Sequence, residues 1–241
     1  MLLLVIVCKK FIYLLNMELA NELNKVRCGI DEYNEWVLSG SPENTVVTHL
    51  DISQNIIAGP LVLNNLPNLQ ELYCEYNLIT EIEGLELPNL QKLDCSHNQI
   101  TEIEGLELPN LQALYCFNNH ITTIEGLELP KLQRLFCGDN QITTIEGLRL
   151  PNLQELGCSH NQIITLAFML PTTLQQLYYS GNPVEYIAPN IQRFLNRSKT
   201  SQGVYNDSQN VHNHHVQECV RTSISRLIGL KPTIVNVRDY I

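Results

Sequence analysis

An asparagine returns every 21 residues through most of this sequence, and the residues around it return with it. The recurring positions are Asn77, Asn98, Asn119, Asn140, Asn161 and Asn182, with Asn55 placed 22 residues before the first of them. Self-similarity at a fixed period of this length is typical of a solenoid, in which each unit packs only against its neighbours. The period therefore predicts a stacked architecture and argues against most enzyme folds.

Each repeat unit divides into a strand and a return segment. The consensus of one unit is L-P-N-L-Q-x-L-x-C-x-x-N-x-I-T-x-I-E-G-L-E. The L-x-x-L-x-C part predicts a short strand whose alternate residues face the core. The rest of the unit is too short for a long helix, so we expect turns or short 3₁₀ segments on the opposite, convex side. Glycines at 84, 105, 126 and 147 permit a sharp bend there.

Two side-chain columns are expected inside the stack. The asparagine amide can satisfy backbone groups that the bend leaves unpaired. The second column holds five of the eight cysteines, at one shared repeat position: Cys74, Cys95, Cys116, Cys137 and Cys158. Side chains of stacked parallel strands point the same way, so we expect buried, reduced thiols rather than disulfides. Reduced thiols indicate a cytoplasmic location, and their spacing fits no zinc motif. We therefore expect no metal and no cofactor.

The motif L-x-x-L-x-C-x-x-N-x-I resembles the leucine-rich repeat family, with cysteine in place of the third leucine. The N-Q-I-T-x-I-E-G-L-E stretch is similar to the short 22-residue class found in internalins and in a regulatory subunit of protein phosphatase 1. The resemblance implies an α/β solenoid with a parallel sheet on its concave face and a role in protein binding. The near-identity of the units, the C-x-x-N variant and the tail from Asp207 to Val220 also resemble repeat proteins of mimivirus-type giant viruses, which would place the chain in a host cytoplasm.

Three regions are expected along the chain. Residues 1–43 would form an N-terminal extension and helical cap, with a helix from Met17 to Arg27 and a second apolar stripe at Tyr33, Trp36 and Val37. Residues 44–187 would form seven repeats. Residues 188–241 would form a capping helix (Pro189 to Arg197), a loop and an amphipathic helix (His215 to Leu230). Caps are expected because a terminal repeat would otherwise expose its core.

The first 16 residues have three open interpretations: a cleaved secretory signal, an extension upstream of a start at Met17, or a short element packed on the first repeat. The chain carries a net charge of −10, which argues against nucleic acids and anionic membranes as partners. No run of 18 apolar residues occurs, so no membrane span is expected.

The strand positions that do not repeat are the candidates for function, because the framework positions scarcely change. Aromatic residues and one arginine concentrate there: Tyr73, Tyr76, Tyr115, Phe117, Phe136 and Arg134. We expect these side chains to form one exposed patch that binds a protein partner, since aromatic residues and arginine dominate binding hot spots. The alternative is that aromatic residues occur here only because they favour sheets.

Two further clusters have a functional and a structural interpretation. Glutamates recur in two columns, Glu83, Glu104, Glu125 and Glu146, and Glu86, Glu107 and Glu128. They would form a cation site, a surface for a basic partner, or simply a solvated face. His212, His214, His215 and Cys219 cluster in the tail, as metal ligands or as exposed polar residues at a helix start.

A non-catalytic interaction module is the leading hypothesis. Cys219 with His215 could be proposed as a nucleophile and its base, but no orienting acid accompanies them, and the tail is too short for a ubiquitin-ligase domain. The runner-up is a structural or assembly role through self-association of the C-terminal helix. The sequence identifies neither the partner nor the oligomeric state.

Overall fold

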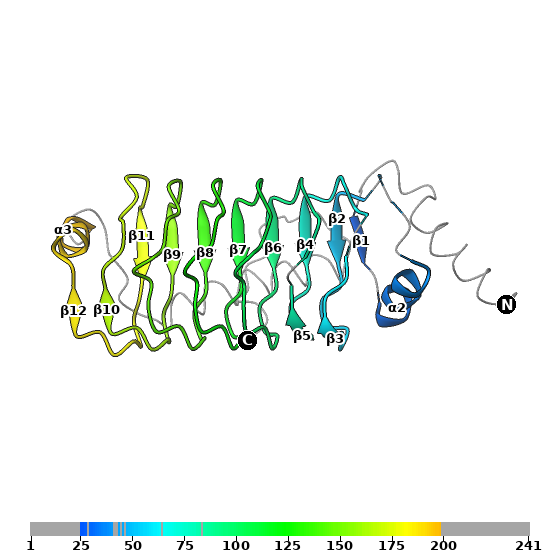
Figure 1. Ribbon diagram of the computed structural model, residues 1–241, viewed down its shortest axis with the longest axis horizontal. Coiled ribbons are helices and arrows are strands. Elements are labelled where there is room, and N and C mark those ends of the chain that lie inside the picture. Colours follow the sequence, from blue (N-terminus) through cyan, green and yellow to red (C-terminus); the bar gives the residue numbers. More distant parts are fainter. Residues whose placement is uncertain are drawn as a thin grey trace, which may run out of the picture.

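The computed structural model describes residues 25–27, 29–40, 43, 45, 47–63, 65–82 and 84–198. These residues form an elongated solenoid whose strands follow one another along a single side (Figure 1). Eight strands form one parallel sheet, each paired with its neighbours in the stack. In spatial order they are β1 (Lys25–Arg27), β2 (His49–Asp51), β4 (Glu71–Tyr73), β6 (Lys92–Asp94), β7 (Ala113–Tyr115), β8 (Arg134–Phe136), β9 (Glu155–Gly157) and β11 (Gln176–Tyr178). The predicted parallel sheet of a repeat solenoid is confirmed.

The strands stack in register, so each repeat position forms a column. Leu114 in the middle of β7 pairs with Leu93 on one side and Leu135 on the other. All three are fully buried, because alternate strand residues point to opposite faces of a sheet. One continuous apolar core results, running from Tyr33 and neighbouring residues at one end to the second helix at the other. The opposite face of this sheet is called the sheet face below; it corresponds to the predicted concave face.

The return segments consist of turns, as expected, and 3₁₀ helix is absent from the described residues. Gly84, Gly105 and Gly126 adopt φ angles of 72°, 74° and 76°, which is the left-handed conformation that the predicted bend requires. Gly147 also lies in a turn, without a positive φ. Two small parallel sheets were not predicted: β3 (Ala58–Pro60) with β5 (Leu78–Glu81), and β10 (Thr165–Leu166) with β12 (Tyr186–Ile187).

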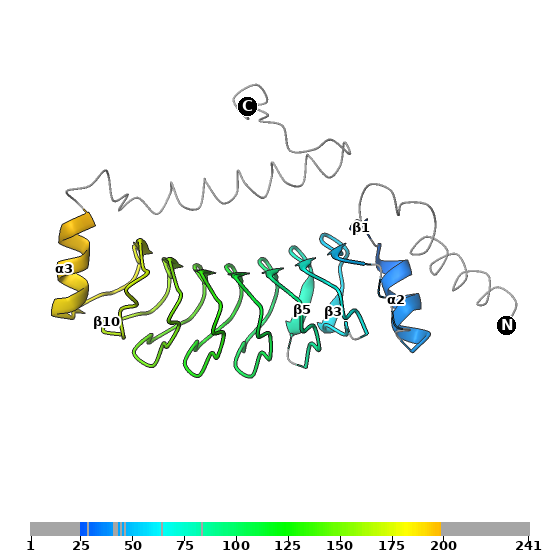
Figure 2. The same ribbon diagram turned by 90° about the horizontal axis from the view of Figure 1, so that it is seen from above.

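A helix lies near each end of the sheet (Figures 1 and 2). In α2 (Ile30–Leu38), Tyr33 is buried, and its hydroxyl accepts a hydrogen bond of 3.1 Å from the Val62 amide. In α3 (Pro189–Ser198), which coincides with the helix expected there, Ile191 and Leu195 are buried in the shared core. Both helices thus contribute side chains to the core, and a capping role for them stays a prediction.

The helix predicted from Met17 to Arg27 is wrong at its C-terminal end. Lys25–Arg27 is strand β1, paired in parallel with β2. The edge of a sheet presents a row of unpaired N–H and C=O groups, and hydrogen bonding to that row outweighs the weak helical spacing. Residues 1–24, the predicted amphipathic helix, the tail histidines, Cys8, Cys28, Cys219 and Glu83 lie outside the described residues. Within the described part, no helix has the length and apolar character needed to cross a membrane.

Candidate functional site

The asparagine column builds the turn that follows each strand. The Asn119 side chain donates from Nδ2 to the carbonyls of Cys95, Cys116 and Phe117 at 3.1, 3.0 and 3.3 Å. Its Oδ1 accepts from the Ile100 amide at 3.0 Å. Cys95 and Ile100 belong to the preceding repeat, so one side chain links two repeats through buried backbone groups. The same pattern recurs from Asn77 to Asn182, which confirms that the column bonds along the stack.

Sequence reasoning missed the conformation of the residue before each asparagine. This residue has a φ of 51–56° in five consecutive repeats, at Tyr76, His97, Asn118, Asp139 and His160. The left-handed backbone turns the chain sharply and directs the next side chain inward. Asparagine, aspartate, histidine and glycine tolerate this conformation best, and glycine stands at this position in the next repeat, at Gly181. The recurrence of these residue types before the asparagine could have predicted the left-handed conformation from the sequence.

A second row of asparagines also escaped the sequence analysis. Asn110 Nδ2 donates 2.7 Å to the carbonyl of Pro88, and Asn152 makes the same bond to Pro130. At the intervening repeat the position is occupied by Lys131, whose Nζ donates to Asn110 Oδ1 at 2.6 Å. These bonds lie at the surface, so this surface asparagine row ties neighbouring repeats together from outside the core.

The cysteine column is buried and free of disulfides, as predicted for the five described thiols. Cys74 Sγ donates to the carbonyl of Asp94 at 3.3 Å, and Cys95 Sγ donates to that of Tyr115 at 3.4 Å. Burial raises the pKa of each thiol well above its usual value, and for Cys158 to about 12. The thiols are therefore protonated packing groups and not nucleophiles, because the thiolate is the reactive form.

Thiol alkylation tests this assignment. Iodoacetamide at mildly alkaline pH is expected to leave the five column cysteines unmodified in the native protein and to modify all of them after unfolding in urea. Peptide mapping by mass spectrometry separates them from the other three cysteines. The ordinary thiol pKa is 9.0 and the folded value for Cys158 is about 12, so the stability from burying neutral Cys158 is complete below about pH 9 and declines as the pH rises toward 12. Modification of a column cysteine in the native protein would contradict the assignment.

Aromatic rings on the sheet face pack against one another across adjacent strands. The Tyr115 and Phe136 rings are stacked, with centroids 5.5 Å apart and an interplanar angle of 6°. The ring centroids of Phe136 and Tyr178 are 6.5 Å apart. The Lys92 ammonium lies 4.9 Å from the Tyr73 centroid and 5.3 Å from that of Tyr115, within the range of a cation–π contact. These five residues form what is called the aromatic row below.

A second aromatic group lies at the C-terminal ends of the strands. Tyr76 stacks on His97 with centroids 4.1 Å apart, and His97 meets Phe117 edge-on at 5.0 Å. His97 Nδ1 and Asn118 Nδ2 are 2.8 Å apart, so Nδ1 accepts from the amide. This contact holds the imidazole between the two aromatic rings.

The expected exposed patch is partly wrong. Tyr76 is 45% exposed, and Arg134 is also exposed, but Tyr115 and Phe117 are only 4% and 7% exposed. In-register strands lie about 4.8 Å apart, so neighbouring rings cover each other's faces and leave little more than edges to solvent. The surface that a partner could touch therefore consists mainly of Tyr73, Tyr76, Phe136, Arg134 and Tyr178, which lie over several repeats.

Two contributors to the aromatic row were missed because neither is unusual on its own. Lys92 lies between two rings. Gly157 provides the space for Phe136, since a Cβ atom built at Gly157 would lie 2.6 Å from Phe136 Cδ1. A glycine at a variable strand position, next to a large aromatic residue on the neighbouring strand, could have predicted this packing from the sequence. Among the residues that the structure describes, no group of three histidine, cysteine, aspartate or glutamate side chains is placed to hold a metal ion.

Comparison with models of protein families shows to which family the chain belongs. A family model described as leucine-rich repeats (2 copies) matches residues 45–87, 88–129 and 130–169, which is more than half of the 241 residues. The chain belongs to the leucine-rich repeat family. Members of this family are typically non-catalytic interaction modules. No curated protein matches this leucine-rich repeat chain significantly.

Solved structures share the fold of this leucine-rich repeat protein. An internalin-like protein of Listeria monocytogenes is 18% identical, with a TM-score of 0.55, over 71% of this chain and 56% of that one. The plant peptide hormone receptor RGFR1, in complex with RGF2, is 23% identical with a TM-score of 0.52, over 72% of this chain and 29% of the receptor. An internalin (inlF) of L. monocytogenes is 23% identical over 61% of this chain and 58% of that one, with a TM-score of 0.48. The match thus spans little more than half of either Listeria protein.

Proposed function

We propose that this leucine-rich repeat protein is a non-catalytic module that binds a protein partner on its sheet face. The observation that carries the proposal is the aromatic row, with Arg134 beside it. The core and turn positions of the central repeats are nearly identical, whereas the residues on this face differ from strand to strand. Residues that vary while the rest of the repeat stays constant are the ones that can select one partner protein over another.

The physical state of the aromatic row favours binding. The Phe136 ring is held between Tyr115 and Tyr178, so little rotamer entropy remains to be lost when a partner covers it. Its remaining exposed part is apolar, and the charged Lys92 and Arg134 stand at the first position of their strands, two residues before the position of Phe136 in the repeat and therefore on the same face of the sheet. Buried aromatic anchors surrounded by polar groups are the arrangement that dominates interface energies.

The proposed partner is a cytoplasmic protein of a host cell. The buried, reduced cysteine column suits a reducing compartment. The resemblance of the repeat units to giant-virus proteins suggests an amoebal host. Both statements extend the proposal and can fail without affecting the assignment of the sheet face.

A binding experiment tests the sheet face. A partner captured from amoebal lysate is titrated against wild type and against the double variant Phe136→Ala/Arg134→Ala. We expect at least about a 30-fold loss of affinity, the effect of removing a hot spot. Tyr115 is left intact in this variant because it is buried and its truncation would also destabilise the fold.

The matched control is Gln162→Ala/Arg193→Ala. Like the sheet-face variant, it removes one cation and one uncharged side chain. Both are exposed and lie away from the aromatic row. Its affinity is expected to stay within about twofold of wild type, since rim and remote positions contribute little. Equal affinities of the wild type and the sheet-face variant would refute the proposal.

A further inference from the structure

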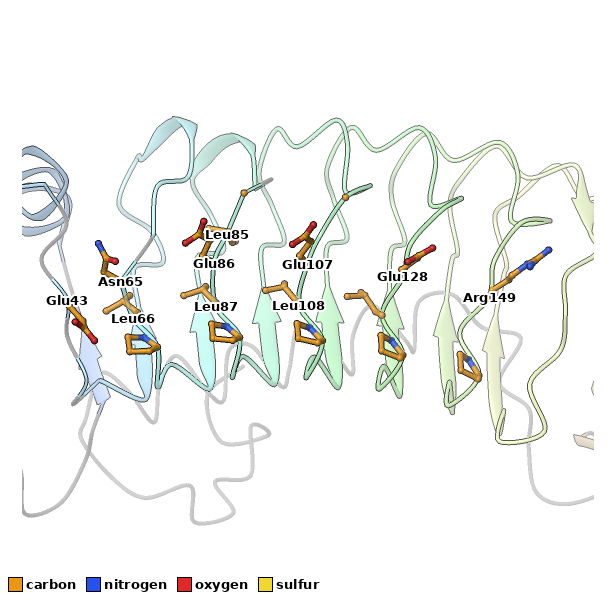
Figure 3. A pocket seen from close by; sticks show the side chains of 18 residues that line it. Glu43, Asn65, Leu66, Leu85, Glu86, Leu87, Glu107, Leu108, Glu128 and Arg149 are labelled. Atoms are coloured by element: carbon orange, nitrogen blue, oxygen red, sulfur yellow. The ribbon is translucent and has the colours of Figure 1, made fainter.

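A long groove runs along the flank of the solenoid, away from the sheet face. Its volume is about 1260 Å³, and it is lined by Glu43 and by the segments that lead from the glycine turns into the strands, from Asn65 to Pro151. Figure 3 shows Glu86, Glu107 and Glu128 side by side along it, with Arg149 beyond them. The groove crosses five successive repeats, so its lining repeats as the sequence does.

The floor of the groove is apolar and poor in hydrogen-bond donors. One proline from each of the five repeats lines it, and four of these prolines are exposed. The leucines that precede them, including Leu87, Leu108 and Leu129, are buried directly beneath. Proline has no backbone N–H, so these positions offer apolar contact and no donor. An anionic or acceptor-rich ligand would find few partners along this row.

The charge along the groove is ordered. Glu86, Glu107 and Glu128 occupy the same position of three consecutive repeats, and all three are exposed. None has a hydrogen bond or ion pair within the described part of the chain. The same position is Asn65 one repeat earlier and Arg149 one repeat later. The row between Asn65 and Arg149 is therefore three carboxylates long, Glu43 lines the groove beyond Asn65, and the charge reverses at Arg149.

We propose that this groove binds an extended, basic segment of a partner protein, with its lysine or arginine side chains on the three glutamates. Neighbouring repeats are about 4.8 Å apart, so the groove from Asn65 to Arg149 spans about 19 Å, the length of about six extended residues. Side chains on one face of an extended segment recur about every 6.6 Å, and the three carboxylates span about 9.6 Å, so two or three long lysine or arginine side chains can reach them while the other face contacts the prolines. Arg149 repels further cations and so fixes the register of the basic run.

The groove is too long and too open for the other ligand that carboxylates suggest. A divalent cation needs six or more oxygen ligands converging within about 2.6 Å, whereas these glutamates lie on separate repeats in a line. A helix about 10 Å wide would bury little against a shallow row of prolines. An extended segment follows the row along its whole length, and the proposal is independent of the sheet face.

The probe for the test is a fluorescein-labelled octapeptide of alternating lysine and leucine, titrated with the full chain at about 0.15 M ionic strength, where charges beyond about 8 Å are screened, and followed by fluorescence anisotropy. The variant Glu86→Gln/Glu107→Gln/Glu128→Gln is expected to bind at least about tenfold more weakly, since three partly exposed ion pairs are lost. These side chains are exposed and make no contacts that the fold needs, so the thermal midpoint should not change.

The matched control is Glu102→Gln/Glu104→Gln/Glu146→Gln, which removes three exposed carboxylates that do not line the groove. Both variants lose three negative charges, so a general attraction of a basic peptide to an acidic chain would weaken them equally. We expect the control to bind within about twofold of wild type. Equal weakening of the two variants, or wild-type binding by the groove variant, would overturn the proposal.

Arg149→Glu provides a gain-of-binding test. It lengthens the carboxylate row by one repeat, and we expect the lysine–leucine peptide to bind more tightly than to wild type, while Phe136→Ala/Arg134→Ala leaves the affinity unchanged. Weaker binding by Arg149→Glu, or loss of binding in the sheet-face variant, would show that the peptide does not lie in the groove. Loss of sheet-face binding to a protein partner would leave this result unaffected.

Discussion

Replacing Asn119 with alanine is expected to lower the free energy of unfolding by about 3–5 kcal/mol. The substitution removes four hydrogen bonds to buried backbone groups, three donated by Nδ2 and one accepted by Oδ1. The Ile100 amide is left without its partner, at a cost of about 1–3 kcal/mol. The three carbonyls each keep one hydrogen bond, from Asn98, Asn140 and the His97 amide, so each bond lost there costs about 1 kcal/mol. Partial relaxation of the turn keeps the total below the sum. Urea denaturation followed by circular dichroism measures the loss.

Asn110→Ala is the matched control for this experiment. It is the same substitution in the turn before the strand of the same repeat. It removes the hydrogen bond that Asn110 Nδ2 donates to the Pro88 carbonyl of the preceding repeat and the one that Asn110 Oδ1 accepts from Lys131. Asn110 belongs to the surface asparagine row, where water can replace the lost partner, so we expect a loss of about 1 kcal/mol or less. A similar loss for both variants would mean that the asparagine column does not owe its effect to burial.

Sequence analysis correctly predicted the features that recur at the same position of every repeat. A residue that recurs in every unit occupies the same environment in every unit, so once strand alternation and turn chemistry placed one cysteine and one asparagine inside, Asn119 and Cys116 followed from the period. The strand positions followed for the same reason, since Leu114 must repeat the environment of Leu93. Because the repeats are periodic, placing one residue of a repeat also places its equivalents in all the other repeats.

Features that depend on neighbours differing from one another were not predictable in this way. The exposure of Tyr115 depends on the Phe136 ring lying over it, and that ring needs the space left by Gly157. Strand β1 forms because a sheet edge is available to it, which a local helical pattern does not reveal. The sequence analysis left Glu107 and its equivalents as a cation site, a surface for a basic partner or a solvated face, and only the structure shows that they line one groove with the prolines.

Replacing Leu114 with alanine is expected to cost about 2–5 kcal/mol, the range for truncating a fully buried leucine. Leu114 has no exposed surface and lies in the middle of the sheet, with Leu93 and Leu135 on its two sides. The cavity would open between two repeat interfaces, because units of a solenoid contact both neighbours. Both interfaces are held by the asparagine column, so the backbone can collapse only partly into the space.

Leu177→Ala makes the same change in β11, the last strand of the sheet, where Leu156 is the partner on one side only. Leu177 is 4% exposed, and no further strand of the sheet pairs with β11 on its outer side among the described residues. We expect a loss near the lower end of the range, about 2 kcal/mol, measured by urea denaturation in parallel with Leu114→Ala. A loss as large as that of Leu114→Ala would contradict this and would mean that α3 packs on the final repeat as tightly as one repeat packs on another. In that case the helix closes the core as a cap, and the stability of the stack does not decline toward this end.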